Sequence, residues 1–84
     1  MAYGKSMNIV FTGTAMVNGK HYDREGLTKV AETYGHAVQK KVNWNTDLLV
    51  VGDETHETTK KRDALRLRTK IVKIDQFLKM MFTV

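Results

Sequence analysis

Residues 47–52 of this 84-residue chain read Asp-Leu-Leu-Val-Val-Gly, four consecutive apolar residues between an aspartate and a glycine. A strand with one face in water alternates apolar and polar residues, whereas a strand buried on both faces is continuously apolar. Such strands are typical of the centre of a parallel sheet, in which helices join the strands and cover both faces. The stretch therefore predicts an α/β fold, and the segments around it should supply the other strands and the helices.

Three further segments have the composition of strands. Residues 7–11 and residues 71–74 are short apolar runs rich in β-favouring side chains, which predicts two more buried strands. Residues 37–42 are typical of an edge strand, because Lys40 and Lys41 would discourage pairing with another molecule. With the central stretch, these segments make a sheet of four strands.

The first predicted helix spans residues 24–34. Asp23 precedes it as an N-cap, and Gly35 follows it at the C′ position, where a residue without a Cβ is favoured. Its apolar residues recur at helical spacing on one face: Leu27, Val30, Ala31 and Tyr34. This face is expected to pack on the sheet.

Two more helices are predicted in the second half of the chain. One is expected to be capped by Thr58 or Thr59 and to run to about Arg68, and the other is expected to be capped by Asp75. The last helix should turn three apolar side chains inward: Phe77, Leu78 and Met81. The order is then β-α-β-β-α-β-α, a mainly parallel sheet with helices on both faces. Asn18-Gly19 is a strong turn signal that could close a small extra hairpin.

Length and composition limit the classes of function. Eighty-four residues make one domain, with a core at about residues 7–81, and no apolar run approaches the roughly 20 residues that span a bilayer. Without cysteine there is no disulfide and no thiolate site. His21, His36 and His56 are scattered, and His36 and His56 are expected at the surface, so neither a metal site nor a cofactor is predicted. No nucleophile–base pair or P-loop indicates an enzyme.

The charge favours a polyanionic partner. Fourteen Lys and Arg against nine Asp and Glu leave a net charge of +5. Residues 60–73 hold seven basic side chains and one acidic one. With Ala64, Leu65 and Leu67 turned inward, four basic residues of the second helix should face solvent and follow a nucleic-acid backbone: Lys61, Arg62, Arg66 and Arg68. A merely solubilising helix surface is the alternative.

The sequence resembles the BRCT domain family, the phosphate-binding modules of DNA repair and replication proteins. The resemblance covers residues 7–81 and rests on five pieces in order: NIVFTGT, DREGLTKVAETYGHAV, NWNTDLLVVGDE, TTKKRDAL and TKIVKIDQFLKM. The chain is most similar to the single modules of bacterial NAD-dependent DNA ligases, the replication factor C large subunit and some bacterial proofreading exonucleases. It differs in having Gly35-His36 where the family has a glycine pair, and in a longer loop after Gly13.

The resemblance implies a phosphate pocket formed by Thr12, Gly13 and Lys60. In members that bind DNA ends, an arginine at the start of the first helix completes the pocket, and Arg24 matches that position. A threonine hydroxyl and a glycine N–H are donors that suit a phosphate oxygen, and a helix N-terminus favours an anion. A guanidinium can grip a phosphate with two parallel hydrogen bonds. Singly, each residue also fits a turn, a solvated helix start or a surface lysine.

We therefore expect a non-catalytic module that binds DNA at a phosphate, the 5′-phosphate of an end, nick or recessed junction. The alternatives are a protein–protein adaptor that binds a phosphopeptide or another repair or replication protein, and an excised BRCT domain of a ligase or exonuclease. Trp44 and Tyr22 are candidates for stacking on bases, although Trp44 is expected rather to plug the end of the sheet. The expected compartment is the bacterial or phage-infected cytoplasm, or the nucleus of a eukaryote.

Overall fold

Apart from a hairpin after the first strand, the strands and helices follow the order that the sequence predicts. The computed structural model describes residues 6–52 and 58–82. In chain order the elements are β1 (Asn8–Thr12), β2 (Ala15–Val17), β3 (Lys20–Tyr22), α1 (Arg24–Thr33), β4 (Ala37–Gln39), β5 (Leu48–Val51), α2 (Thr58–Arg66), β6 (Lys70–Lys73) and α3 (Ile74–Phe82). The predicted α/β fold is confirmed, with a short hairpin added between β1 and α1.

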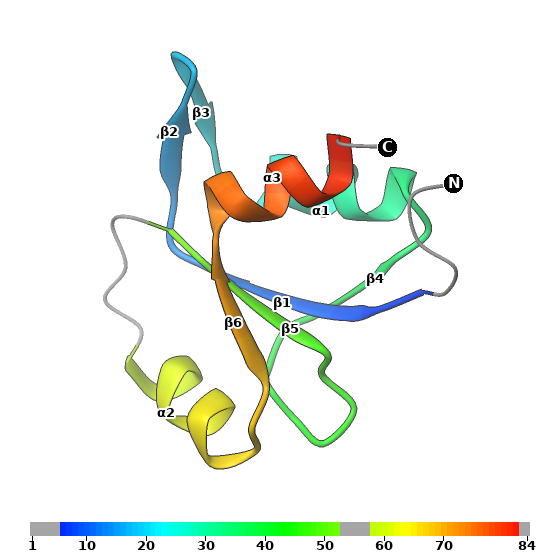
Figure 1. Cartoon of the computed structure of the whole chain (residues 1–84), viewed down its shortest axis with the longest axis vertical. Helices are drawn as coiled ribbons and strands as arrows, with labels where there is room; N and C mark the ends of the chain where they lie inside the picture. Colours follow the sequence, from blue (N-terminus) through cyan, green and yellow to red (C-terminus); the bar gives the residue numbers. More distant parts are fainter. Residues whose placement is uncertain (1–5, 53–57, 83–84) are drawn as a thin grey trace.

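Four of the described strands form a parallel sheet in the order β4-β1-β5-β6 (Figure 1). Strand β5, the apolar run of residues 48–51, is buried along its whole length between β1 and β6. Strand β4 lies at one edge, as predicted, but ends at Gln39 rather than Val42. The register pairs Thr12 of β1 with Val51 of β5, so these two strands end side by side at one edge of the sheet.

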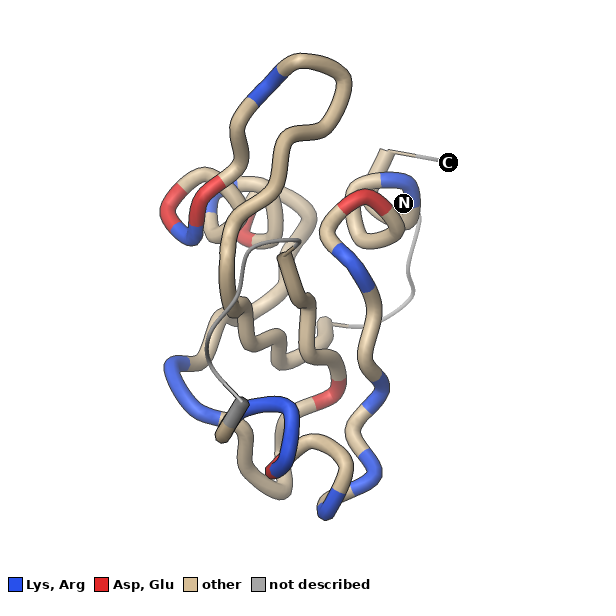
Figure 2. Tube along the Cα trace, turned by 90° about the vertical axis from the view of Figure 1, so that its left-hand side faces the viewer, with Lys and Arg blue, Asp and Glu red and all other residues tan. Residues whose placement is uncertain are grey.

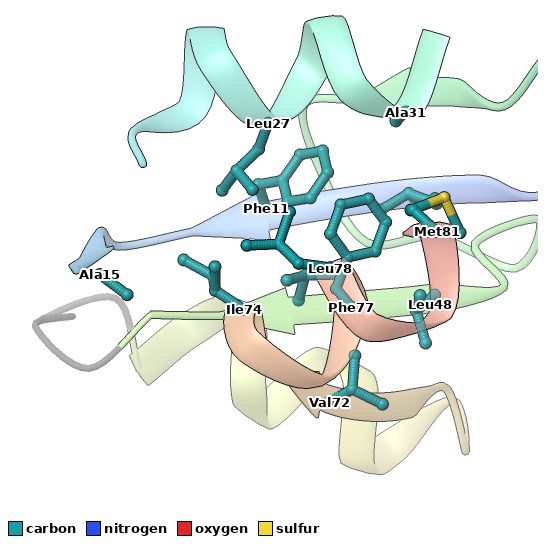
Figure 3. Close-up of a cluster of buried hydrophobic side chains, with 12 residues drawn as sticks. Phe11, Ala15, Leu27, Ala31, Leu48, Val72, Ile74, Phe77, Leu78 and Met81 are labelled. Carbon is teal, nitrogen blue, oxygen red and sulfur yellow. The ribbon is translucent and has the colours of Figure 1, made fainter. Parts of the chain in front are cut away.

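Helices cover both faces of the sheet, as predicted. In Figure 1, α1 and α3 lie on one face and α2 on the other. Figure 3 shows the larger hydrophobic cluster, in which side chains of α1 and α3 meet those of β1. The rings of Phe11 and Phe77 touch edge to face, with their centroids 5.2 Å apart. The smaller cluster lies under α2 and consists of Val10, Leu49, Val51 and Ala64.

Local signals set both ends of α1. The side chain of Asp23 accepts a hydrogen bond from the backbone N–H of Gly26 at 2.9 Å, which confirms the predicted N-cap. At the other end, Gly35 has a φ of 84°, and its N–H donates to the carbonyl of Glu32. The N–H of His36 donates to the carbonyl of Ala31, which completes a Schellman motif. The predicted C′ glycine is therefore confirmed.

The ends of α2 and α3 differ from the prediction. Helix α2 begins at Thr58, so Thr58 and Thr59 belong to its first turn and the prediction that one of them caps it was wrong; any cap before Thr58 lies outside the described residues. The helix ends at Arg66 rather than Arg68. Helix α3 begins at Ile74, directly after β6, so Asp75 lies in its first turn and is not the cap. There the Gln76 side chain accepts a hydrogen bond from the backbone N–H of Lys73, the residue before the helix, at 3.2 Å, which is one half of a capping box.

The hairpin between β1 and α1 follows from two residues. Asn18 and Gly19 have φ values of 52° and 79°, the left-handed conformations that a tight hairpin turn requires. Strands β2 and β3 pair antiparallel on either side of this turn and project beyond the sheet (Figure 1). Among the described residues, no helix is long and apolar enough to cross a membrane.

Candidate functional site

The turn after β1 is held tightly against the end of β5. The backbone N–H of Gly52 donates to the carbonyl of Thr12 at 2.8 Å, and Gly13 has a φ of 81° that favours glycine. A Cβ added at Gly52 would collide with the backbone of Thr14. Glycine is therefore needed at both positions, and the close approach fixes the path of residues 12–14.

Lys60 reaches this turn from the other half of the chain. It lies in the first turn of α2, is half-buried, and its Nζ donates to the carbonyl oxygen of Phe11 at 3.2 Å, across 49 residues of sequence. This hydrogen bond places a positive charge at the end of β1, next to Thr12 and Gly13. The first turn of α2 adds the positive end of a helix dipole. The structure thus brings together three of the residues that the resemblance implies.

Thr12 faces the α2 side of the sheet. Side chains alternate along a strand, and Val10 of β1 belongs to the cluster under α2 while Ile9 and Phe11 belong to the other cluster. Thr12 therefore points the same way as Val10, toward the layer that carries Lys60. It is only 2% exposed, whereas Gly13 and Lys60 are half-buried, so these two residues form the accessible part of the site.

Arg24 belongs to the opposite layer. It is the first residue of α1, which covers the other face of the sheet, and it is exposed. The carboxylates of Asp23 and Glu25 flank it in sequence, so the start of α1 carries one positive and two negative charges. Asp23 already caps the helix, and Glu25 lies 4.0 Å from Lys29. A role for Arg24 in the pocket stays a prediction.

The exposed face of α2 differs from the predicted one, because it includes an apolar residue among the basic ones. Ala64 is fully buried, but Leu65 is 71% exposed, which corrects the expectation that it packs inward. Each residue of a helix is rotated by about 100° from the last, so a helix that turns Ala64 onto the sheet turns Leu65 away from it. Arg62 and Arg66 are exposed beside Leu65, and Lys61 is half-buried.

Two further features modify this basic surface. Arg66 Nη2 lies 3.3 Å from a carboxylate oxygen of Asp63, so part of its charge is already compensated. Arg68 is exposed just beyond the helix, with a φ of 59° that is unusual for a residue with a Cβ. Figure 2 views the side on which β1 and β5 end, and basic residues mark α2, the loop after β4 and the two ends of β6.

The histidines do not gather into a site. His36 is buried, and its Nδ1 accepts a hydrogen bond from the backbone N–H of Met7 at 3.0 Å, so the prediction of a surface residue was wrong. His21 is exposed on β3, and His56 lies outside the described residues. Over residues 6–52 and 58–82, no group of three or more His, Cys, Asp or Glu side chains has the arrangement of a metal site.

Trp44 was expected to plug the end of the sheet, and this expectation was wrong. Its side chain is 85% exposed in the loop between β4 and β5. The sequence held one signal for this position, because Trp44 lies between Asn43 and Asn45 in a polar stretch. Gly52 was likewise not singled out as a site residue, although a glycine directly after a buried strand is a sign of close backbone approach.

Comparison with known proteins agrees with the fold. The family model of the BRCA1 C Terminus (BRCT) domain matches residues 5–81, nearly the whole chain. No curated protein matches the chain. Domains of this family are generally non-catalytic modules that bind phosphopeptides, proteins or DNA, with links to DNA repair and replication. The parallel sheet, the helices on both faces and the match to the family model together show that the chain belongs to the BRCT domain family.

Proposed function

We propose that this protein is a non-catalytic module that binds a phosphate on DNA, the 5′-phosphate at an end, a nick or a recessed junction. The observation that carries the proposal is the hydrogen bond from Lys60 Nζ to the carbonyl of Phe11, because it holds a positive charge beside the turn at Thr12 and Gly13. The protein would act where the DNA is, in the bacterial or phage-infected cytoplasm or in a eukaryotic nucleus.

The terminal phosphate would contact the accessible part of the site first. Gly13 has no side chain to keep a ligand from its backbone, and Lys60 supplies the charge. Thr12 lies beneath them, and its carbonyl is bound to the N–H of Gly52. A phosphomonoester carries more negative charge than a phosphodiester inside the strand, so a site of this kind favours a DNA end over the backbone.

The adjoining strand would lie along the basic surface of α2 and the residues after it. Arg62, Arg66 and Arg68 are exposed there, and Lys61 is half-buried. Each backbone phosphate that these side chains neutralise releases counterions, so the affinity should fall as the salt concentration rises. In a plot of log affinity against log salt concentration, each phosphate neutralised on duplex DNA should contribute about −0.9 to the slope. These backbone contacts do not depend on the base sequence of the DNA, and the proposal includes no contact that reads bases in a groove.

The test compares two recessed-end duplexes that differ only in a 5′-phosphate or a 5′-hydroxyl. Binding is followed by fluorescence anisotropy at two salt concentrations. The wild-type protein should bind the phosphorylated duplex more tightly, and Lys60→Met should lose that difference while keeping the aliphatic stem of the side chain. The matched control is Lys79→Met, which removes the same charge from an exposed position on α3.

The ratio of the two affinities is the deciding quantity, because it does not change with the fraction of protein that is folded. Equal binding of both duplexes by the wild-type protein would contradict the proposal. If Lys79→Met lost the preference for the phosphorylated duplex as Lys60→Met does, the net charge of the protein, and not this site, would be the cause of the preference.

A protein adaptor is the second candidate, and one observation favours it. A groove of about 540 Å³ lies between the β2–β3 hairpin and α3, and its walls include the exposed side chains of Met16 and Phe82. Lys73 and Lys79 also line it, against the single carboxylate of Asp75, so it suits a partner segment with apolar and acidic side chains. A phosphopeptide would bind with a shallow salt dependence, whereas DNA would give a steep one.

A further inference from the structure

Trp44 is presented to solvent on an ordered loop. It is the only tryptophan of the chain, and the residue is 85% exposed to solvent. Single exposed apolar residues are common on proteins, but an indole is the largest side chain and is usually kept from water when nothing binds it. The structure of the surrounding loop shows whether this position is accidental.

Hydrogen bonds hold the loop on both sides of Trp44. The N–H of Asn43 donates to Thr46 Oγ1 at 2.9 Å, the N–H of Thr46 donates back to the carbonyl of Asn43, and the N–H of Asn45 donates to Asn43 Oδ1 at 2.8 Å. The side chain of Asn8 on β1 donates to the carbonyl of Asn45 at 2.8 Å. The backbone that carries the indole is therefore already ordered, and a ligand would bind it without a large loss of chain entropy.

The loop lies on the same face of the sheet as α2. Val42, two residues before Trp44, packs against the cluster that contains Ala64 of α2. The loop and α2 also lie on the same face in Figure 1. The loop that carries Trp44 and the helix that carries Arg62 and Arg66 therefore lie on one face of the sheet.

The loop that carries Trp44 has a net positive charge, because two lysines outnumber the one carboxylate, that of Asp47, which accepts a hydrogen bond from the backbone N–H of Asn8 at 2.8 Å. Lys40 and Lys41 are both exposed in the same loop, and within the described part of the chain neither forms an ion pair. The remaining exposed side chains beside the indole include Asn43 and Asn45, which are neutral hydrogen-bonding groups. An exposed indole on a loop that also carries two exposed lysines matches a polymer that alternates flat bases with phosphates, and it fits less well an apolar protein surface.

We propose that Trp44 is a stacking platform for an unpaired base of single-stranded DNA, with Lys40 and Lys41 contacting the neighbouring phosphates. The inference rests on the proposed function in taking DNA as the ligand, but it does not require a 5′-phosphate. It extends the contact from the DNA end to an unpaired segment, so a junction with a single-stranded extension becomes a better ligand than a blunt duplex. The stacking contribution is independent of base sequence, because every base has a π-face.

The experiment uses Trp44 as its own reporter. The wild-type protein is titrated with an unphosphorylated oligothymidylate and with an oligonucleotide of equal length whose sugars carry no bases. The first should quench the tryptophan emission and bind at least about fivefold more tightly, which corresponds to the lower end of the usual stacking energy. The second should bind through the lysines alone and leave the emission nearly unchanged.

Variants then separate stacking from folding and charge. By anisotropy, Trp44→Leu should bind both oligonucleotides equally, and Trp44→Phe should keep part of the preference for the one with bases. Leu65→Ala, which removes another exposed apolar side chain from α2, should keep all of it. Equal binding of both oligonucleotides by the wild-type protein overturns the inference and leaves Trp44 as a contact for a protein. The duplex test of the 5′-phosphate is separate, because the oligonucleotides here lack that group.

Discussion

Lys60 Nζ donates a hydrogen bond to the carbonyl oxygen of Phe11 at 3.2 Å. The bond joins the first turn of α2 to the end of β1, through two residues that are 49 positions apart in the sequence. Because Phe11 also packs edge to face on Phe77, the same strand end is fixed from both faces of the sheet. The candidate phosphate site therefore rests on an ordered part of the molecule.

Substitution of Gly52 by alanine should destabilise the fold. The new Cβ would collide with the backbone of Thr14, which cannot move away without breaking the hydrogen bond from Gly52 to Thr12. We expect a loss of about 1–3 kcal/mol in the free energy of unfolding, the usual cost of overpacking, measured by urea denaturation. The control is Gly26→Ala in α1, where the Cβ would make an ordinary 3.4 Å contact with Asp23 Oδ1. This variant should be more stable than the wild type by about 0.5–1 kcal/mol. Equal stabilities for the two variants would contradict this account of the turn.

Arg68→Gly should raise stability and lower DNA affinity at the same time. Arg68 holds the C′ position of α2: its N–H donates to the carbonyl of Leu65, the N–H of Thr69 donates to that of Ala64, and its φ is 59°. The left-handed conformation costs a residue with a Cβ about 1–2 kcal/mol, and the greater chain entropy of unfolded glycine offsets about 0.5–1 kcal/mol of that.

The net gain expected from Arg68→Gly, about 0.5–1 kcal/mol, is measurable as a shift of the denaturation midpoint. Loss of one phosphate contact should reduce the salt slope of DNA binding by about one unit. Asn18→Gly is the control, since Asn18 also has a positive φ but lies in the hairpin turn. A more stable variant that binds DNA as the wild type does would remove Arg68 from the DNA surface.

Arg62 and Arg66 should contribute unequally to DNA binding. Arg66 is paired with Asp63 at 3.3 Å, so it must give up or share that partner to bind a phosphate. No carboxylate of the described residues is paired with Arg62. Arg62→Gln is therefore expected to reduce the salt slope by about one unit and Arg66→Gln by less. Asp63→Asn should bind DNA more tightly than the wild type. Weaker binding by that variant would argue against the view that the pairing with Asp63 limits the contribution of Arg66.

Arg24→Gln tests whether α1 contributes to the pocket. The resemblance to end-binding family members implies that Arg24 holds the phosphate, while the structure places it on the layer opposite Lys60 and between two carboxylates in sequence. We expect Arg24→Gln to lower the preference for 5′-phosphorylated DNA, but by less than Lys60→Met does. Lys29→Gln, an exposed change on the same helix, should have no effect. An unchanged preference in Arg24→Gln would exclude Arg24 from the site.

Local chemistry explains what the sequence predicted well. The continuous apolar run at Leu48–Val51, the cap at Asp23 and the left-handed Gly35 each depend on the residue itself and its nearest neighbours. These signals were enough for the order of elements, the parallel sheet and the position of Lys60 near the start of α2.

The errors concern side chains whose surroundings are set from a distance. His36 is buried because its ring accepts a hydrogen bond from Met7, 29 residues away, and nothing beside it in the sequence shows this. Leu65 is exposed because the rotation of α2 on the sheet is fixed by Ala64, the smaller residue next to it. Trp44 is exposed on a loop whose path is set partly from a distance, because Asn8 of β1 binds the carbonyl of Asn45 and Thr46 binds the N–H of Asn43.

The edge-to-face contact between Phe11 and Phe77 also has a consequence for biosynthesis. Within this domain, Phe11 is translated before most of the core and Phe77 after most of it, and Ile9 likewise precedes its partners in β5 and α3. A nascent chain therefore exposes the apolar side of β1 until α3 has emerged, and only then can the larger cluster close. Folding is therefore expected to follow translation of almost the whole domain, and until then the exposed apolar side of β1 makes the unfinished domain prone to aggregation.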